Sequence, residues 1–273
     1  MPNHVMNHIS VRGDDAEYTK LRTIMEFVKP DGKPLGYVDF NKLIPMPPSL
    51  NIEAGSRGDR GLKLYREYNS AVEAITIRER TGRLSEQQKE IRLSDLQKHY
   101  KNLVKDDPEV FELGKQYYEN IQKYGCTTWY DWCIKNWGTK WNAYECIPWD
   151  KSRDQLSFYT AWDGVPVILE ALSKRFAGME IEYRWADEDI GNNVGWMVFQ
   201  DGAITEDMSP SSGSKEAYEQ AAEMWELDLT SEGFMLSQDG STYEYRSQEA
   251  IAESPPPEQP RKKDKPRSRG EAR

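Results

Sequence analysis

Four tryptophans lie within thirteen residues of this 273-residue chain, together with side chains that carry charge or an amide. Indole rings stack on the flat faces of bases, and neighbouring polar groups can bind a base edge or a phosphate. The block therefore predicts an aromatic pocket for a base or nucleoside, or a layer of hydrophobic core. Its candidate residues are Trp129, Asp131, Trp132, Trp137, Lys140, Trp141 and Asn142.

Helical spacing within this aromatic block favours the core. Thr127 is a suitable N-cap and Gly138 a suitable end for a short helix. On that helix Trp129, Cys133 and Trp137 share one face, as residues of a buried stripe do. Under this interpretation Trp129→Ala costs about 3–5 kcal/mol.

A second group of candidate residues is acidic. The chain has a formal net charge of −10, and residues 185–232 hold twelve Asp/Glu and one lysine. Such a segment is either a solvated face or a surface that attracts a basic partner. Residues 187–189 could also share a cation, although a solvated turn explains them better. The candidate interface residues are Asp187, Glu188, Asp189, Glu216, Glu219, Glu223 and Glu226.

Basic residues gather elsewhere, in residues 56–105 and in the tail 253–273. Net acidity disfavours nucleic acid as the main partner, because phosphates require positive charge. Only weak contacts are expected, through 56–105 or the tail. The proline- and charge-rich tail is expected to be disordered.

The sequence offers little that indicates catalysis. It has no Walker lysine loop and no G-x-S-x-G. Three histidines and three cysteines lack the spacing of a zinc site, so we expect no metal and no cofactor. We find no apolar run of 18 residues and no secretory signal, which predicts no membrane association and a cytoplasmic location.

Alternating and helical patterns predict the elements that position these residues. Strands are expected at 4–12, 37–40, 140–147, 155–161, 179–185 and 194–200, with a hairpin at 234–245. Helices are expected after the first strand, three times within 56–123, after Thr127, after Pro166 and at 214–228.

This order predicts an α+β fold, a ferredoxin-like α/β sandwich in which an antiparallel sheet carries helices on one face. Residues 1–50 and 124–202 would form this domain and 56–123 a helical insertion. Residues 203–252 would form an acidic C-terminal extension, a helix plus a hairpin, before the basic tail.

Three segments resemble one protein family. They are MPNHVMNHISVRG at the start, FNKLIPMPPSL, and the aromatic block followed by FYTAWDGVPVILEALSKRF. Together they are similar to the YubB family of plasmid and phage proteins, whose domain is described as ferredoxin-like. Most of that family has an aromatic residue after Met-Pro-Asn, where this chain has His4. The resemblance implies a mobile-element protein in a bacterial cytoplasm and supplies no catalytic residues.

Two functions remain open from the sequence. The first is a non-catalytic phage or plasmid protein that binds a host protein with a basic surface, such as a defence component, through its acidic segment. The alternative is a nucleotide- or nucleic-acid-binding module, or an enzyme, that uses the aromatic block as its pocket.

Overall fold

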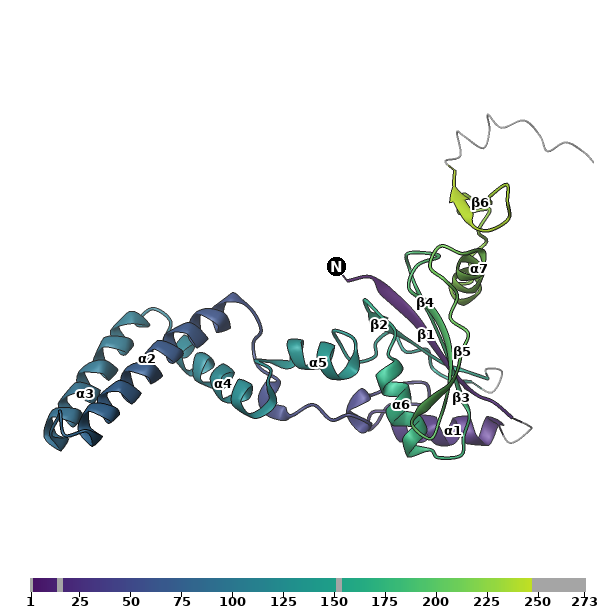
Figure 1. Cartoon of the computed structure of the whole chain (residues 1–273). Coiled ribbons are helices and arrows are strands. Elements are labelled where there is room, and N and C mark those ends of the chain that lie inside the picture. The colour runs from purple at the N-terminus through teal and green to yellow at the C-terminus, as the bar shows by residue number, and fades with distance from the viewer. Residues whose placement is uncertain (1, 14–16, 151–153, 247–273) are drawn as a thin grey trace, which may run out of the picture.

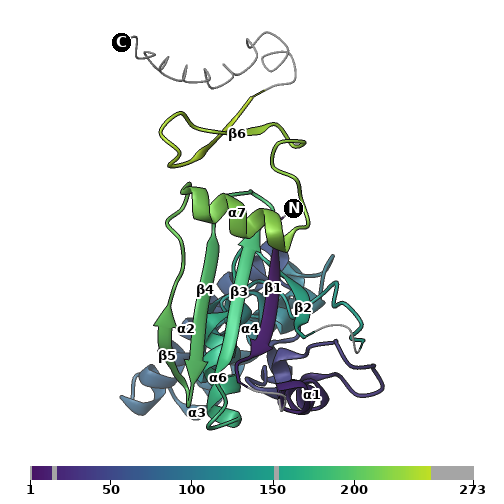
Figure 2. The same ribbon diagram turned by 90° about the vertical axis from the view of Figure 1, so that its right-hand side faces the viewer.

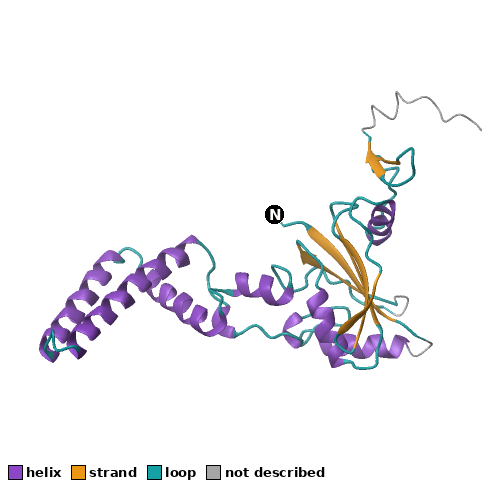
Figure 3. Cartoon of the chain, in the orientation of Figure 1, coloured by secondary structure: helices purple, strands orange, loops and turns teal. Residues whose placement is uncertain are grey.

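A five-stranded antiparallel sheet is the centre of the molecule (Figures 1 and 3). The computed structural model describes residues 2–13, 17–150 and 154–246. Strand order across the sheet is β2-β1-β3-β4-β5, and every neighbouring pair is antiparallel. The strands are β1 (His4–Val11), β2 (Leu156–Ala161), β3 (Ile181–Asp187), β4 (Val194–Gln200) and β5 (Ala203–Asp207).

Side chains of β1 alternate between the two faces of the sheet, and both faces are covered. Val5, Ile9 and Val11 are buried in the main core, whereas Met6 belongs to a separate cluster on the opposite face. Successive side chains of a strand point to opposite faces, so one strand contributes to both layers. The strand predicted at 4–12 is confirmed.

One face of the sheet is covered by three helices, α1 (Glu17–Val28), α5 (Trp129–Trp137) and α6 (Pro166–Arg175). The other face carries α7 (Lys215–Met224), the helix of the predicted acidic extension, which crosses the sheet in Figure 2. Small residues let α7 lie close, because Ala217 and Ala221 are fully buried against Met6 and Ala186. The acidic helix is therefore packed on the sheet.

Residues 56–123 form a helical arm that projects away from the sheet in Figure 1. It consists of α2 (Ser56–Arg80), α3 (Glu86–Leu103) and α4 (Glu109–Tyr124). The capping box predicted for Ser85 and Gln88 is present at the start of α3. α2 and α4 cross at Gly61 and Gly114, where an added Cβ on either residue would collide with the backbone of the other helix.

Two predicted strands are wrong. Residues 37–40 run irregularly into a short 3-10 helix, η1 (Phe40–Lys42), before a second one, η2 (Pro48–Leu50). Within 140–147, Tyr144 alone forms a bridge, to Tyr159 of β2. Hydrogen bonds from side chains replace those of a strand pair in both segments. The Asn142 Oδ1, for example, accepts a hydrogen bond from the Phe40 N–H at 2.8 Å.

The C-terminal part of the described chain ends in the predicted hairpin, β6 (Phe234–Leu236) with β7 (Tyr243–Tyr245). The tail 253–273, with its expected disorder, lies outside the described residues. Over the described ranges, no helix is both long enough and apolar enough to cross a membrane.

Candidate functional site

The aromatic block starts on α5, which begins one residue later than the sequence predicts. Thr128 is the N-cap, because its hydroxyl accepts a hydrogen bond from the Tyr130 N–H. Gly138 ends the helix in a left-handed conformation with φ of 78°. The neighbouring Thr127 hydroxyl donates instead to Asp131 at 2.7 Å. Asp131 thus fixes the first turn of α5.

Two of the four tryptophans lie inside the protein. Trp132 and Trp137 are buried in the main core, with their rings edge to face at 5.4 Å. The Trp137 Nε1–H donates to the Ile44 carbonyl at 2.9 Å, which satisfies the polar end of that ring. Trp129 packs against the same core and is half-buried. A base could stack on Trp132 or Trp137 only if the core opened.

Asn142 joins the aromatic block to the segment before the helical arm. Its Nδ2–H donates to Asp39 Oδ1 at 2.6 Å, and its Oδ1 accepts from the Phe40 and Ala143 N–H groups. Both ends of this amide are therefore occupied by protein. Asn142 holds η1 in place, and its polar atoms are not directed at a ligand.

The remaining part of the block forms an exposed group of rings around one lysine, here called the lysine–aromatic cluster. The Lys140 ammonium lies 4.6 Å from the Trp141 ring, 5.1 Å from Trp162 and 5.7 Å from Tyr130. Trp141 and Trp162 are 37% and 40% exposed. These distances suit cation–π attraction. Sequence reasoning missed Trp162, which lies on the turn after β2 with φ of 76°.

The acidic candidates on α7 lie on the outer side of that helix. Ser214 caps its N-terminus, and the inner side is buried on the sheet. Glu216, Glu219 and Glu223 are exposed, at spacings of three and four that place them on one side of a helix. Glu226 follows just after the helix and is also exposed. These four carboxylates are called the acidic face below.

The three acids at 187–189 have a different role from the acidic face. Asp187 is only 4% exposed, and its carboxylate accepts hydrogen bonds from the Asn3 and Asn193 amides. Glu188 accepts from the His4 N–H at 3.0 Å, and Asp189 accepts from Asn192 at 3.1 Å. These groups stabilise the turn between β3 and β4. Of the predicted interface residues in this turn, Asp187 is buried, whereas Glu188 and Asp189 are exposed.

A hollow of about 280 Å³ lies beside the acidic face. Arg184 lines this hollow and forms a bidentate ion pair with Glu223 at 2.8 and 2.9 Å. Its guanidinium lies 5.1 Å from the centre of the Trp196 ring. The ion pair lowers the pKa of Glu223. The hollow is lined by Arg184, Trp196, Met208, Pro210, Glu216, Glu219, Gln220 and Glu223.

Next to β4, β5 forms an edge of the sheet that the sequence did not predict. All five of its residues are exposed, so it lacks the alternation that marks a strand. Ile204 and, just beyond the strand, Met208 are 44% and 36% exposed. The opposite edge, β2, is covered in part by the Tyr144 bridge. Met208 lines the hollow with the carboxylates of α7, whereas Ile204 pairs with Phe199 and lies on the main-core face of the sheet.

Residues suited to metal or thiol chemistry are not gathered in the described part of the chain. Over residues 2–13, 17–150 and 154–246, no three His, Cys, Asp or Glu side chains come together as metal ligands. Cys126 and Cys133 are buried. Burial raises the pKa of Cys133 to about 11, which keeps its thiol protonated at neutral pH.

A match to one family model supports the fold. Residues 136–228, from the end of α5 through α7, match the family model described as "Ferredoxin-like domain in Api92-like protein". The chain is also similar to the crystal structure of a protein api92 from Yersinia pseudotuberculosis. Identity is 12% and the TM-score 0.37, over 78% of this chain and 99% of that one. No curated protein sequence matches. The chain contains a ferredoxin-like domain, as predicted.

Proposed function

We propose that this chain is a non-catalytic binding protein whose acidic face docks on a basic surface of another protein. The observation that carries the proposal is the two-sided character of α7. Its inner side, which includes Ala217, Ala221 and Met224, is buried on the sheet, whereas Glu216, Glu219 and Glu223 are exposed. A rigid helix that presents several carboxylates together creates a local negative potential.

The surroundings of the acidic face suit a protein partner better than a free cation. Met208, Pro210 and the Trp196 ring line the same hollow as the carboxylates. Interfaces combine an apolar centre with a charged rim that steers association. The acidic face would supply the steering, and the apolar groups of the hollow would supply buried contact area.

The biological setting belongs to the same proposal. The three segments that resemble the YubB family of plasmid and phage proteins motivate a mobile-element origin and a bacterial cytoplasm as location. A protein of this kind that lacks a catalytic centre can act by occupying a host protein, such as a component of defence. The partner sought is therefore a basic bacterial protein.

Charge reversal tests this proposal. The double variant Glu216→Lys/Glu219→Lys should lose a partner that wild type captures from bacterial lysate at low salt. The matched control, Glu67→Lys/Glu73→Lys, makes the same change in net charge on exposed residues of the helical arm and should retain that partner. High salt should weaken capture by wild type. Equal capture by both double variants would contradict the proposal.

A second candidate function rests on the lysine–aromatic cluster. Trp141 and Trp162 are exposed beside the Lys140 ammonium, so a base could stack there with its phosphate near the lysine. Nucleotide titration should then change tryptophan fluorescence saturably, and Lys140→Gln should abolish the change. Lys135→Gln, an exposed lysine of α5, is the control. A silent titration would remove this candidate.

A further inference from the structure

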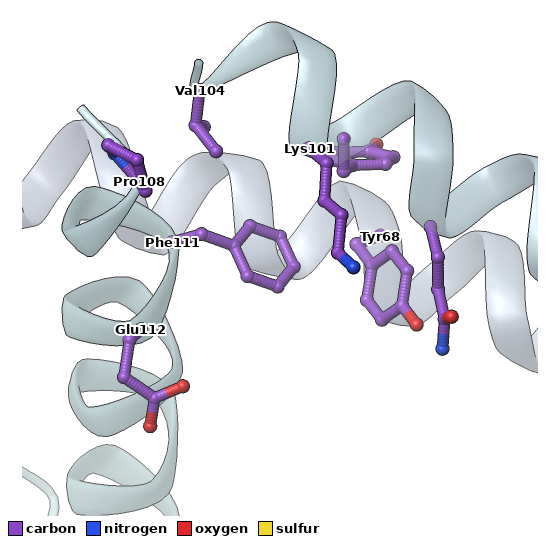
Figure 4. Close-up of a pocket in the computed structure, with 8 residues that line it drawn as sticks. Tyr68, Lys101, Val104, Pro108, Phe111 and Glu112 are labelled. Carbon is purple, nitrogen blue, oxygen red and sulfur yellow. The ribbon is translucent and has the colours of Figure 1, made fainter. Parts of the chain in front are cut away.

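A cavity lies in the helical arm, distant in sequence from the acidic face. It has a volume of about 630 Å³ and opens between α3 and α4 against α2 (Figure 4). That volume is in the range of pockets that hold small molecules. Its lining is Tyr68, Gln97, Tyr100, Lys101, Val104, Pro108, Phe111 and Glu112.

The walls of this arm pocket are aromatic. Phe111 lies edge to face with Tyr68 at 5.3 Å, and Tyr68 in turn lies edge to face with Tyr100 at 5.3 Å. In Figure 4 the rings of Phe111 and Tyr68 face the same opening. Edge-to-face walls leave ring faces available to a flat apolar group. The pocket therefore suits an aromatic ring.

Lys101 is the one cation among the described residues that line this opening. Lys101 makes no ion pair with any residue that the structure describes, and its ammonium points toward the Tyr68 ring in Figure 4. Over the same described residues, the Tyr68 and Tyr100 hydroxyls and the Gln97 amide form no hydrogen bond within the protein. The one acid of the lining, Glu112, lies 3.9 Å from Lys115.

Charge over the three helices around the pocket is slightly positive. Residues 56–124, which include α2, α3 and α4, hold fourteen Lys/Arg and twelve Asp/Glu. The attraction for an anion therefore comes from Lys101 itself, because an ammonium beside apolar walls binds an anion more strongly than one in open water. A ligand with a ring and an anionic group would satisfy both the walls and the donors.

We infer that the arm pocket binds a small aromatic anion, its ring against the wall formed by Phe111 and Tyr68 and its anionic group on Lys101. This site is independent of the acidic face and of the proposed partner. Size favours a small molecule over a protein segment, because the cavity is bounded by three helices.

Anilinonaphthalene sulfonate, an aromatic anion whose fluorescence rises on binding, is a direct probe. Wild-type chain should bind it saturably, with the largest amide shifts in NMR spectra at residues 97–112. Lys101→Gln should weaken binding about tenfold, as the loss of a charge-assisted contact does, whereas Lys101→Arg should retain it. Lys98→Gln, an exposed lysine one turn earlier on α3, is the matched control and should bind as wild type does.

Three results would overturn the inference. One is equal affinity of Lys101→Gln and Lys98→Gln for the probe. Another is binding of the neutral analogue phenylnaphthylamine as tightly as the anion. The third is that the wild-type chain does not bind the probe saturably, while Lys101→Gln weakens capture of a protein partner. That pair of results would mean that the pocket binds a side chain of the partner.

Discussion

Two short helices, α5 and α7, serve opposite faces of one sheet and use their residues in opposite ways. α5 buries large rings, including Trp132 and Trp137, in the main core. α7 buries alanines and keeps Glu219 among its exposed residues. Large tryptophan rings thus build the fold, whereas glutamates remain exposed to a partner. Accessibility, more than residue type, decides which helix can bind.

The largest expected effect belongs to α5. Trp137→Ala should lower the free energy of unfolding by about 3–5 kcal/mol, because it removes a buried ring and leaves the Ile44 carbonyl without its hydrogen bond. Trp141→Ala, in the exposed part of the same block, should cost far less. Urea unfolding of both variants checks the difference. Similar losses would mean that the block is not divided into core and surface.

The second largest loss of stability is expected from buried hydrogen bonds on the face of the sheet that α5 covers. The fully buried Tyr183 hydroxyl donates to Asn7 Oδ1 at 2.6 Å and accepts from the Val165 N–H at 2.6 Å. Tyr183→Phe leaves both groups unsatisfied and should cost about 1–3 kcal/mol. Tyr245→Phe, in the exposed hairpin, is the control. An unchanged urea midpoint for Tyr183→Phe would show that these two hydrogen bonds do not contribute to the free energy of unfolding.

On α7 the outer side should tolerate change that the inner side does not. Glu219→Lys should alter the free energy of unfolding by no more than about 0.5 kcal/mol, because the residue is exposed. Ala221→Leu should cost about 1–3 kcal/mol, since added methylenes have no space against the sheet. Thermal melting of the two variants compares the sides. Equal losses would mean that the acidic face is structural.

The smallest effect concerns pH. Arg184 lowers the pKa of Glu223, so this ion pair stabilises the fold above the usual carboxyl range, near pH 4. Stability is lost as the pH falls through the lowered pKa and the carboxylate becomes protonated. At this exposed site the pair contributes about 0.2–1 kcal/mol. Melting temperatures of wild type and Glu223→Gln should therefore differ slightly at pH 7 and converge as the pH falls through the lowered pKa of Glu223. A gap that persists in acid would contradict the ion-pair explanation.

Much of the fold follows from local patterns in the sequence. Val5, Ile9 and Val11 alternate strictly, so β1 and its buried face could be predicted. Ser85 with Gln88 gave the start of α3 because a capping box is a local device. The fold class was likewise predictable, because strands and helices followed one another in an order that few architectures fit.

Other features depend on contacts distant in sequence. Residues 140–147 contain alternating apolar groups, yet Asn142 binds Asp39 and Phe40 and draws the chain away from a regular ladder. β5 is exposed throughout and shows no pattern. Trp162 joins Lys140 only through tertiary packing. Composition identified the acidic segment, but burial alone distinguishes the structural Asp187 from the exposed acids of α7.

The central claim is that the partner binds the acidic face and leaves the buried aromatic block untouched. Hydrogen–deuterium exchange of the chain with and without a captured partner tests it most directly. Slower exchange in the bound state should appear at residues 203–226, which include β5 and α7. Peptides over 129–137 should exchange at the same rate in both states. Protection confined to 129–142 or to the helical arm, with none at 203–226, would contradict the account.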